Sequence, residues 1–140
     1  KKPEPIAEGE VSAALLAEVG TGRVVYEYNS EEKLPAAGLT RLAALVSVCK
    51  GFDEGRLKPG DAVSVSEKAA GIGGTTAFLK AGEQMDAETM LLAAVMINAG
   101  DATHSLALAA AGSESAAVQE INACMAGIGV ETNRCSVDGK

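Results

Sequence analysis

Residues 33–45 read KLPAAGLTRLAAL, and this stretch contains the start of the helix on which the fold depends. Pro35 ends the extended segment before it. The apolar residues that then recur at helical spacing are Leu39, Leu42, Ala43, Val46 and Cys49. The pattern predicts a central helix that ends at Gly51 and buries this face. Gly38 stands in its first turn, where glycine is tolerated at small cost. Either this glycine only suits the backbone at the start of the helix, or it stands where a functional side chain has been lost.

The length and composition of the chain favour one domain made mainly of helices. A chain of 140 residues is long enough to bury roughly 68–70% of the surface that its unfolded form exposes. Its residues are 47% hydrophobic and 3% aromatic, which favours helices packed closely on small side chains. The net charge of −7 and the lack of a Lys or Arg cluster argue against nucleic acid or an anionic membrane as partners. No apolar run approaches the ~18 residues of a membrane-spanning helix.

The first part of the chain predicts a β-hairpin. Residues 11–19 and 23–28 are two extended segments, and the turn residues 20–22 separate them. Residues 62–66 alternate as a further short extended piece, and the glycine-rich residues 71–76 mark a loop. A two-stranded hairpin is marginal by itself, so we expect either a partner chain or further residues after the last one to complete the sheet.

Three helices are predicted after the glycine-rich loop. The residues that favour helix ends are Asp86, Asp101 and either Ser113 or Ser115 as N-caps, and Gly127 or Gly129 after the last helix. The second of these helices is expected to run from the break near Ala99 to Ala110. A hairpin followed by helices indicates an α+β fold.

The three cysteines give no metal or redox motif. Cys49, Cys124 and Cys135 show none of the C-x-x-C spacing that such sites use. Cys49 lies on the apolar face of the predicted helix and is expected to be a small buried side chain. A bridge between Cys124 and Cys135 is compatible with an oxidising compartment and stays open.

Three segments of the chain carry a family resemblance. Residues 12–37, SAALLAEVGTGRVVYEYNSEEKLPAA, look like an opening hairpin and the approach to a nucleophile helix. Residues 64–114, SVSEKAAGIGGTTAFLKAGEQMDAETMLLAAVMINAGDATHSLALAAAGSE, look like the loop and helices around a second motif, and residues 121–139, INACMAGIGVETNRCSVDG, look like a closing helix. Together they resemble the D-alanyl-D-alanine carboxypeptidases, low-molecular-mass penicillin-binding proteins that share a fold with class A β-lactamases. The resemblance implies the helical lobe of that fold with an N-terminal hairpin and an incomplete sheet.

The chemistry of that family rests on the motifs Ser-x-x-Lys, Ser-x-Asn and Lys-Thr-Gly. In the first motif, Ser and Lys lie on one face of a helix, so the lysine amine takes the hydroxyl proton while the serine attacks a carbonyl. The matching positions here are Gly38 and Arg41. Gly38 has no atom for the attack, and a guanidinium does not deprotonate in proteins. The first motif is therefore lost.

The second motif is also altered. In the stretch MINAGDATHSLA, the serine position matches Asn98 and the asparagine position matches Gly100. A register one residue later places Ala99 and Asp101 there and restores neither side chain. The third motif lies on a later strand of the family, which this sequence is expected to stop short of at Lys140.

The resemblance implies a role in peptidoglycan metabolism outside the cytoplasmic membrane. Residues 1–140 are predicted to be a single penicillin-binding-protein-like domain, truncated before the third motif, that is inactive and binds a peptidoglycan stem peptide or a protein partner. Arg41 is the candidate ligand-binding residue, because a guanidinium holds a carboxylate through two hydrogen bonds; pairing with a neighbouring acid is the simpler alternative. Two other functions stay open: an active serine-type carboxypeptidase that forms an acyl-enzyme with penicillin, and a structural module that forms a homo-oligomer through its open sheet edge.

Other polar residues are weaker candidates. Thr40 and Ser105 carry hydroxyls, but His104 does not face Ser105, because adjacent helical residues point about 100° apart. A lone His104 does not make a zinc site, which needs three or four ligands, and it is expected on a helix surface or partly packed. The glycines of GIGGTT, residues 71–76, lack the spacing of a phosphate-binding loop and are expected to border the family's cleft. No metal and no cofactor are predicted.

Overall fold

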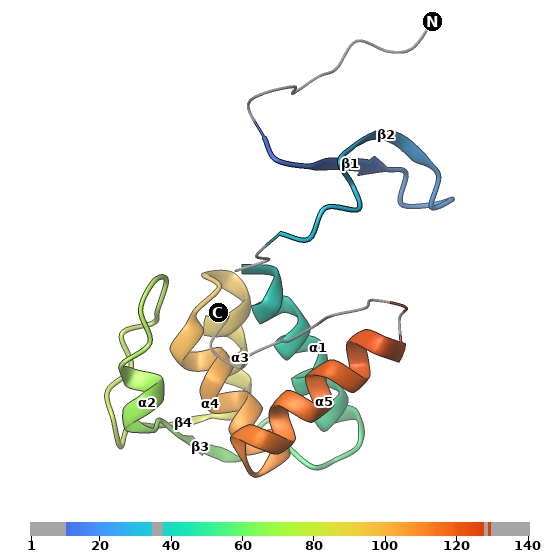
Figure 1. Cartoon of the computed structure of the whole chain (residues 1–140). Helices are drawn as coiled ribbons and strands as arrows, with labels where there is room; N and C mark the ends of the chain where they lie inside the picture. The colour runs from blue at the N-terminus through green and yellow to red at the C-terminus, as the bar shows by residue number, and fades with distance from the viewer. Residues whose placement is uncertain (1–10, 35–37, 128, 130–140) are drawn as a thin grey trace, which may run out of the picture. The chain divides into compact units, whose positions relative to one another are not determined.

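The computed structural model describes residues 11–34, 38–127 and 129, and the chain divides between residues 35 and 36 into two compact units (Figure 1). The first unit contains the hairpin and the second contains all the helices. The predictions that involve Cys135 and the two ends of the chain fall outside the described residues. Within the described residues, no helix combines the length and the apolar character needed to cross a membrane.

The first unit is an antiparallel hairpin of β1 (Ala14–Ala17) and β2 (Val24–Tyr28). The backbone N–H of Glu18 donates to the carbonyl of Arg23 at 2.9 Å and closes the turn. Gly22 lies in the left-handed region at φ 69°, which glycine adopts without steric cost. The predicted hairpin is confirmed, with strands shorter than the extended segments expected from the sequence.

The second unit is made of five helices and one small sheet among the described residues. In chain order its elements are α1 (Gly38–Asp53), β3 (Ala62–Ser64), α2 (Glu67–Ala70), β4 (Gln84–Asp86), α3 (Ala87–Met96), α4 (Gly100–Ala111) and α5 (Glu114–Gly127). β3 and β4 pair antiparallel, with Val63 opposite Met85. The extended piece predicted over residues 62–66 is confirmed as β3, whereas β4 was not among the predicted elements.

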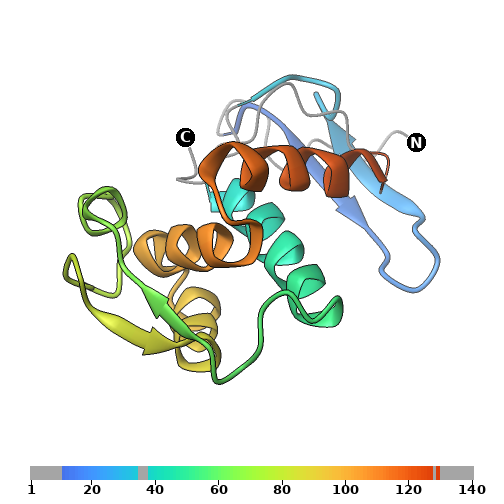
Figure 2. The same ribbon diagram turned by 90° about the horizontal axis from the view of Figure 1, so that it is seen from below.

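Helix α4 forms the centre of the second unit. It contacts α1, α3 and α5, and it lies in the middle of the helices in Figure 2. Residues 100–107 are all buried, since most of them are small enough for neighbouring helices to approach closely. The largest fully buried side chains are Leu106 of α4, Met90 of α3 and Ile121 of α5.

The buried face of α1 is not the face that the periodicity predicted. Its core residues include Ala43, Ala44, Leu45 and Val48. The predicted face is confirmed only at Ala43, since four of its members are exposed: Leu39, Leu42, Val46 and Cys49. The helix carries apolar side chains on both sides, so periodicity alone could not select the side that packs against α4 and α5.

The expected end of α1 at Gly51 is also wrong, because the helix continues to Asp53. Gly51 is buried, and a Cβ added there would lie 3.1 Å from the Cβ of Ala110. This glycine therefore marks a close crossing of α1 and α4 and does not end the helix.

Two of the predicted N-caps are confirmed. The Asp86 side chain accepts a hydrogen bond from the backbone N–H of Thr89 at 2.9 Å and caps α3. The Ser113 hydroxyl accepts one from the backbone N–H of Ala116 at 3.2 Å, at the start of α5. Both satisfy N–H groups that have no partner inside their helix.

Candidate functional site

The site begins in the first turn of α1. Gly38 is the first residue of this helix and Arg41 follows one turn later, so the two positions share a face. Arg41 is partly buried. The structure therefore brings together the two positions that match the nucleophile and the base of the first motif.

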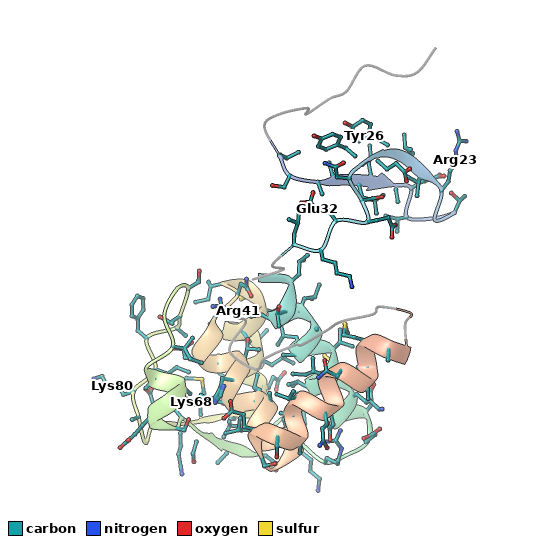
Figure 3. The ribbon with its side chains drawn as sticks, viewed as in Figure 1. Arg23, Tyr26, Glu32, Arg41, Lys68 and Lys80 are labelled. Atoms are coloured by element: carbon teal, nitrogen blue, oxygen red, sulfur yellow. The ribbon has the colours of Figure 1, made fainter. Side chains whose placement is uncertain are left out.

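The guanidinium of Arg41 joins three segments that are far apart in sequence (Figure 3). Its Nη1 donates to the carbonyl of Asn98 at 2.7 Å and to the carbonyl of Thr75 at 3.3 Å. No carboxylate among the described residues forms an ion pair with Arg41. Among the described residues, backbone carbonyls thus take the place of the acid that the alternative expected.

The carbonyl that Arg41 binds most closely lies just beyond the end of α3. Asn98 adopts φ 53°, in the left-handed region that asparagine tolerates better than most residues. The last turn of α3 contains no basic residue. A cation near the last carbonyls of a helix is favourable, so Arg41 supplies from α1 the charge that α3 lacks.

Gly100 lies directly beside the Arg41 side chain. Its backbone N–H donates to the carbonyl of Thr75 at 2.9 Å. A Cβ at this position would lie 2.9 Å from Nη2 of Arg41 and 2.9 Å from Cγ2 of Ile72. The position that matches the family's asparagine therefore has no room for a side chain in this arrangement.

The side chain of Asp101 binds the segment that follows the glycine-rich residues 71–76. Its carboxylate, 1% exposed, accepts hydrogen bonds from the backbone N–H groups of Ala77, Leu79 and Ala102 at 2.9 to 3.1 Å. The prediction that Asp101 is the N-cap of α4 is wrong, since Ala99 holds that position without a side-chain bond. These hydrogen bonds from the loop to Asp101 were not predicted from the sequence. The one feature of the sequence that pointed to them is an acidic residue in front of a long apolar run.

The loop of residues 71–76 borders this site, as predicted. The carbonyl of Thr75 accepts from both Arg41 and Gly100. Gly74 adopts φ +87°, and a Cβ on it would lie 3.5 Å from Nη2 of Arg41. Small residues therefore surround the guanidinium on the loop side and on the helix side.

Of the remaining hydroxyl and imidazole candidates, Thr40 lies partly buried in the first turn of α1, whereas Ser105 and His104 lie inside α4. Ser105 is buried and its hydroxyl donates to the carbonyl of Asp101 at 2.9 Å. His104 is 1% exposed, so the expectation of a surface or partly packed histidine is wrong; α4 is surrounded by other helices. No group of three or more His, Cys, Asp or Glu is placed to hold a metal ion in the described ranges.

An apolar groove of about 470 Å³ adjoins the site between α1 and α3. Its lining residues are Leu39, Leu42, Leu45, Val46, Cys49, Ala94, Val95 and Asn98. Asn98 belongs both to the groove and to the contacts of Arg41. The exposed apolar face of α1 is therefore one wall of a groove that reaches the site.

Solved structures with the same fold are penicillin-binding proteins. Penicillin binding protein 5 from Haemophilus influenzae has a TM-score of 0.77 at 21% identity, over 85% of this chain and 36% of that one. Penicillin-Binding Protein D2 from Listeria monocytogenes, solved in an ampicillin-bound form, has a TM-score of 0.77 at 20% identity, over 91% of this chain and 51% of that one. The predicted α+β, penicillin-binding-protein-like fold is confirmed.

The sequence comparisons identify the family. Residues 2–137 match the D-alanyl-D-alanine carboxypeptidase family. D-alanyl-D-alanine carboxypeptidase DacF of Bacillus subtilis (strain 168) is 35% identical over 113 residues, which make up 81% of this chain and 29% of that relative. The chain belongs to the D-alanyl-D-alanine carboxypeptidase family, as the resemblance implied, and spans less than a third of this curated relative.

Proposed function

We propose that this chain is a D-alanyl-D-alanine carboxypeptidase-like domain of peptidoglycan metabolism that binds a cell-wall peptide without cleaving it. The observation that carries the proposal is the pair of Gly38 and Arg41 at the nucleophile and base positions of α1. We place the chain outside the cytoplasmic membrane and residues 1–140 in one penicillin-binding-protein-like domain, both by analogy with the family.

The two positions that match the family's nucleophile and base carry no groups for acyl transfer. Acylation needs a hydroxyl that attacks and a neutral base that takes its proton. Position 38 has no side chain, and the arginine at position 41 stays protonated. The hydroxyls of Thr103 and Ser105 are buried and donate to carbonyls of their own helix at 2.7 and 2.9 Å. A substrate in this site would therefore remain intact.

The same site retains a feature suited to a carboxylate. Nη1 of Arg41 is occupied by two carbonyls, whereas Nε and Nη2 form no hydrogen bond to any described residue. This edge of a guanidinium presents two parallel N–H groups, the geometry that a carboxylate accepts. The terminal carboxylate of a stem peptide fits this edge, and the apolar groove that begins at Asn98 offers contact for its methyl groups.

Titration with an N-acetylated peptide ending in D-Ala-D-Ala tests this proposal. Binding to the protein is followed by calorimetry or by NMR chemical shifts, with the C-terminally amidated peptide in parallel. We expect Arg41→Met to weaken binding by about tenfold or more, since one charge-assisted pair contributes roughly 1.5–3 kcal/mol. Lys50→Met, which removes the same charge at the other end of α1, is the matched control and should bind normally.

Two results would contradict the carboxylate site. Equal affinity for the free acid and the amide would show that the carboxylate is not recognised. Normal affinity of the Arg41→Met protein would show that the peptide binds elsewhere. Release of D-alanine during the titration would contradict the loss of activity, and would favour the alternative of an active carboxypeptidase.

The hairpin supports a second candidate, a protein-binding or self-association function. Within the described residues β1 and β2 form a two-stranded sheet, so each strand has an edge without a neighbouring strand, and such edges invite strand addition. Its exposed apolar side chains include Leu15, Leu16, Val24 and Val25. Sedimentation velocity over a range of concentrations tests self-association: a dimer that Val25→Pro dissociates would support it, and a monomer throughout would exclude it.

A further inference from the structure

The guanidinium of Arg41 occupies space that a side chain at position 100 would need. The guanidinium lies where the first atom of any side chain at position 100 would be, with Nη2 at 2.9 Å and Cζ at 3.1 Å from that Cβ. Contacts below 3.0 Å require one of the atoms to move, at a low cost only where that atom is the free end of a flexible side chain, and here the guanidinium is held by two carbonyls. An asparagine at position 100, which the family's second motif contains, is therefore incompatible with the present position of Arg41.

We infer that Arg41 is the positioning residue of this site and that its conformation depends on the absence of a side chain at Gly100. In this position the guanidinium donates hydrogen bonds to the carbonyl of Thr75 in the glycine-rich loop and to the carbonyl of Asn98 after the end of α3. The loss of the motif residues at 41 and 100 is thus one coupled change. This inference concerns the packing of the site and does not depend on which ligand it binds.

The position of the guanidinium is fixed from several sides. Nη1 has two carbonyl acceptors that belong to different segments, and a Cβ added at Gly74 or Gly100 would lie 3.5 or 2.9 Å from Nη2. A lysine has a compact ammonium without the planar fork of arginine. It therefore cannot place donors and fill the volume beside Gly100 in the same way.

A side chain at position 100 would displace this arrangement. The guanidinium would have to leave, and the carbonyls of Thr75 and Asn98 would lose their donor. Gly100 is also the first residue of α4 and donates to Thr75, so a backbone shift there would disturb the same loop. Restoring the asparagine of the second motif should therefore be tolerated only after Arg41 has been replaced.

A double-mutant cycle measures this dependence. Gly100→Ala adds only the Cβ and is compared in the natural background and in the Arg41→Lys background by thermal unfolding. In the natural background we expect the midpoint to fall by about 5 °C or more, because overpacking of a full site is destabilising. In the Arg41→Lys background the same substitution should lower the midpoint by about half as much. The remainder is expected from Ile72, whose Cγ2 lies equally close to that Cβ.

Gly73→Ala is the matched control. Position 73 is in the same loop but has nothing within 4 Å of an added Cβ and no positive φ, so its effect should be small and the same in both backgrounds. Ile72→Ala separates the second contact: combined with Gly100→Ala and Arg41→Lys, it should remove most of the remaining cost. The guanidinium Nε–H resonance of Arg41 provides an independent signal, which should shift in Gly100→Ala and not in Gly73→Ala.

The inference fails if the cost of Gly100→Ala is the same with arginine and with lysine at position 41, since the two positions would then be independent. It also fails if Gly100→Ala is neutral and leaves the Arg41 resonance unchanged. Either result can be obtained whether or not the protein binds a stem peptide, so this test and the titration succeed or fail separately.

Discussion

At the scale of single residues, two charged side chains organise the site through hydrogen bonds to backbone groups. Arg41 donates to the carbonyls of Thr75 and Asn98, and Asp101 accepts from the N–H groups of the following loop segment. Between Ala77 and Leu79, whose N–H groups donate to Asp101, Phe78 adopts φ 58° and is 88% exposed. The loop is therefore held in an unfavourable backbone conformation by a buried carboxylate.

Replacing that carboxylate by an amide should destabilise the protein. In Asp101→Asn one acceptor oxygen becomes an NH₂ group that faces backbone donors, so at least one buried N–H loses its partner. We expect the free energy of unfolding to fall by about 2–3 kcal/mol, measured by urea denaturation. Asp61→Asn is the control, because the Asp61 carboxylate accepts from Lys58 in an exposed turn and should matter much less. Equal costs would show that Asp101 does not hold the loop.

Cys49 provides a test of which side of α1 is exposed. Its thiol is exposed and that of Cys124 is half-buried, so a thiol reagent should label Cys49 in the native protein faster than Cys124. Cys49→Ser should remove the fast phase and change the free energy of unfolding by less than about 0.5 kcal/mol. Labelled positions are assigned by peptide mass spectrometry. Protection of Cys49 until the protein unfolds would indicate that this face of α1 is covered.

The contacts of the positions that we match to the family's motifs could not be predicted from the sequence. Gly38 and Arg41 are recognisable by their order and spacing relative to the family's first motif. That Arg41 binds carbonyls and no acid depends on the loop and on the end of α3, which are distant in sequence. The burial of His104 likewise follows from the helices around α4, since its own neighbours in sequence do not determine it.

At the scale of elements, helix ends were predictable because capping is local chemistry. Asp86 and Ser113 were identified from residue type and position, and both accept the expected N–H group. The buried face of α1 was not predictable in this way. Its apolar residues occupy more than one side, so the choice is made by the close packing of Gly51 on Ala110 and of the neighbouring alanines.

The cap of α3 predicts a pH dependence with a definite sign. The hydrogen bond from the backbone N–H of Thr89 holds the pKa of the Asp86 carboxyl below its usual value. A pKa that is lower in the folded state means that the charged cap stabilises the fold above the unfolded pKa, about 3.9 for Asp. That stabilisation is lost as the pH falls through the lower, folded pKa.

Asp86→Ala should therefore lower the thermal midpoint at pH 7 by about 3 °C. Asp86→Asn keeps a capping oxygen without a charge and should lose only the part that depends on ionisation. The difference between the natural protein and Asp86→Asn should shrink as the pH falls below about 4 and disappear below the folded pKa. A difference that is constant between pH 7 and pH 2 would contradict this account of the cap.

At the scale of the whole molecule, the chain has the fold of its family, and Gly38 and Arg41 stand at the positions that we match to its nucleophile and base. The core is formed by small residues of α4 and by larger side chains that include Met90, Leu106 and Ile121. The fold class was predictable because the order of hairpin, loop and helices is preserved in the sequence. The division into two compact units and the short strand β4 were not, because neither produces a local pattern.

The most direct test of the loss of activity is the intact mass of the protein before and after incubation with a penicillin. Penicillin-Binding Protein D2 from Listeria monocytogenes, which has been solved with ampicillin bound, serves as the positive control under the same conditions. The account predicts an unchanged mass, because position 38 has no hydroxyl and the hydroxyls of α4 are buried. A covalent adduct would contradict it, and peptide mapping of the adduct would identify the nucleophile.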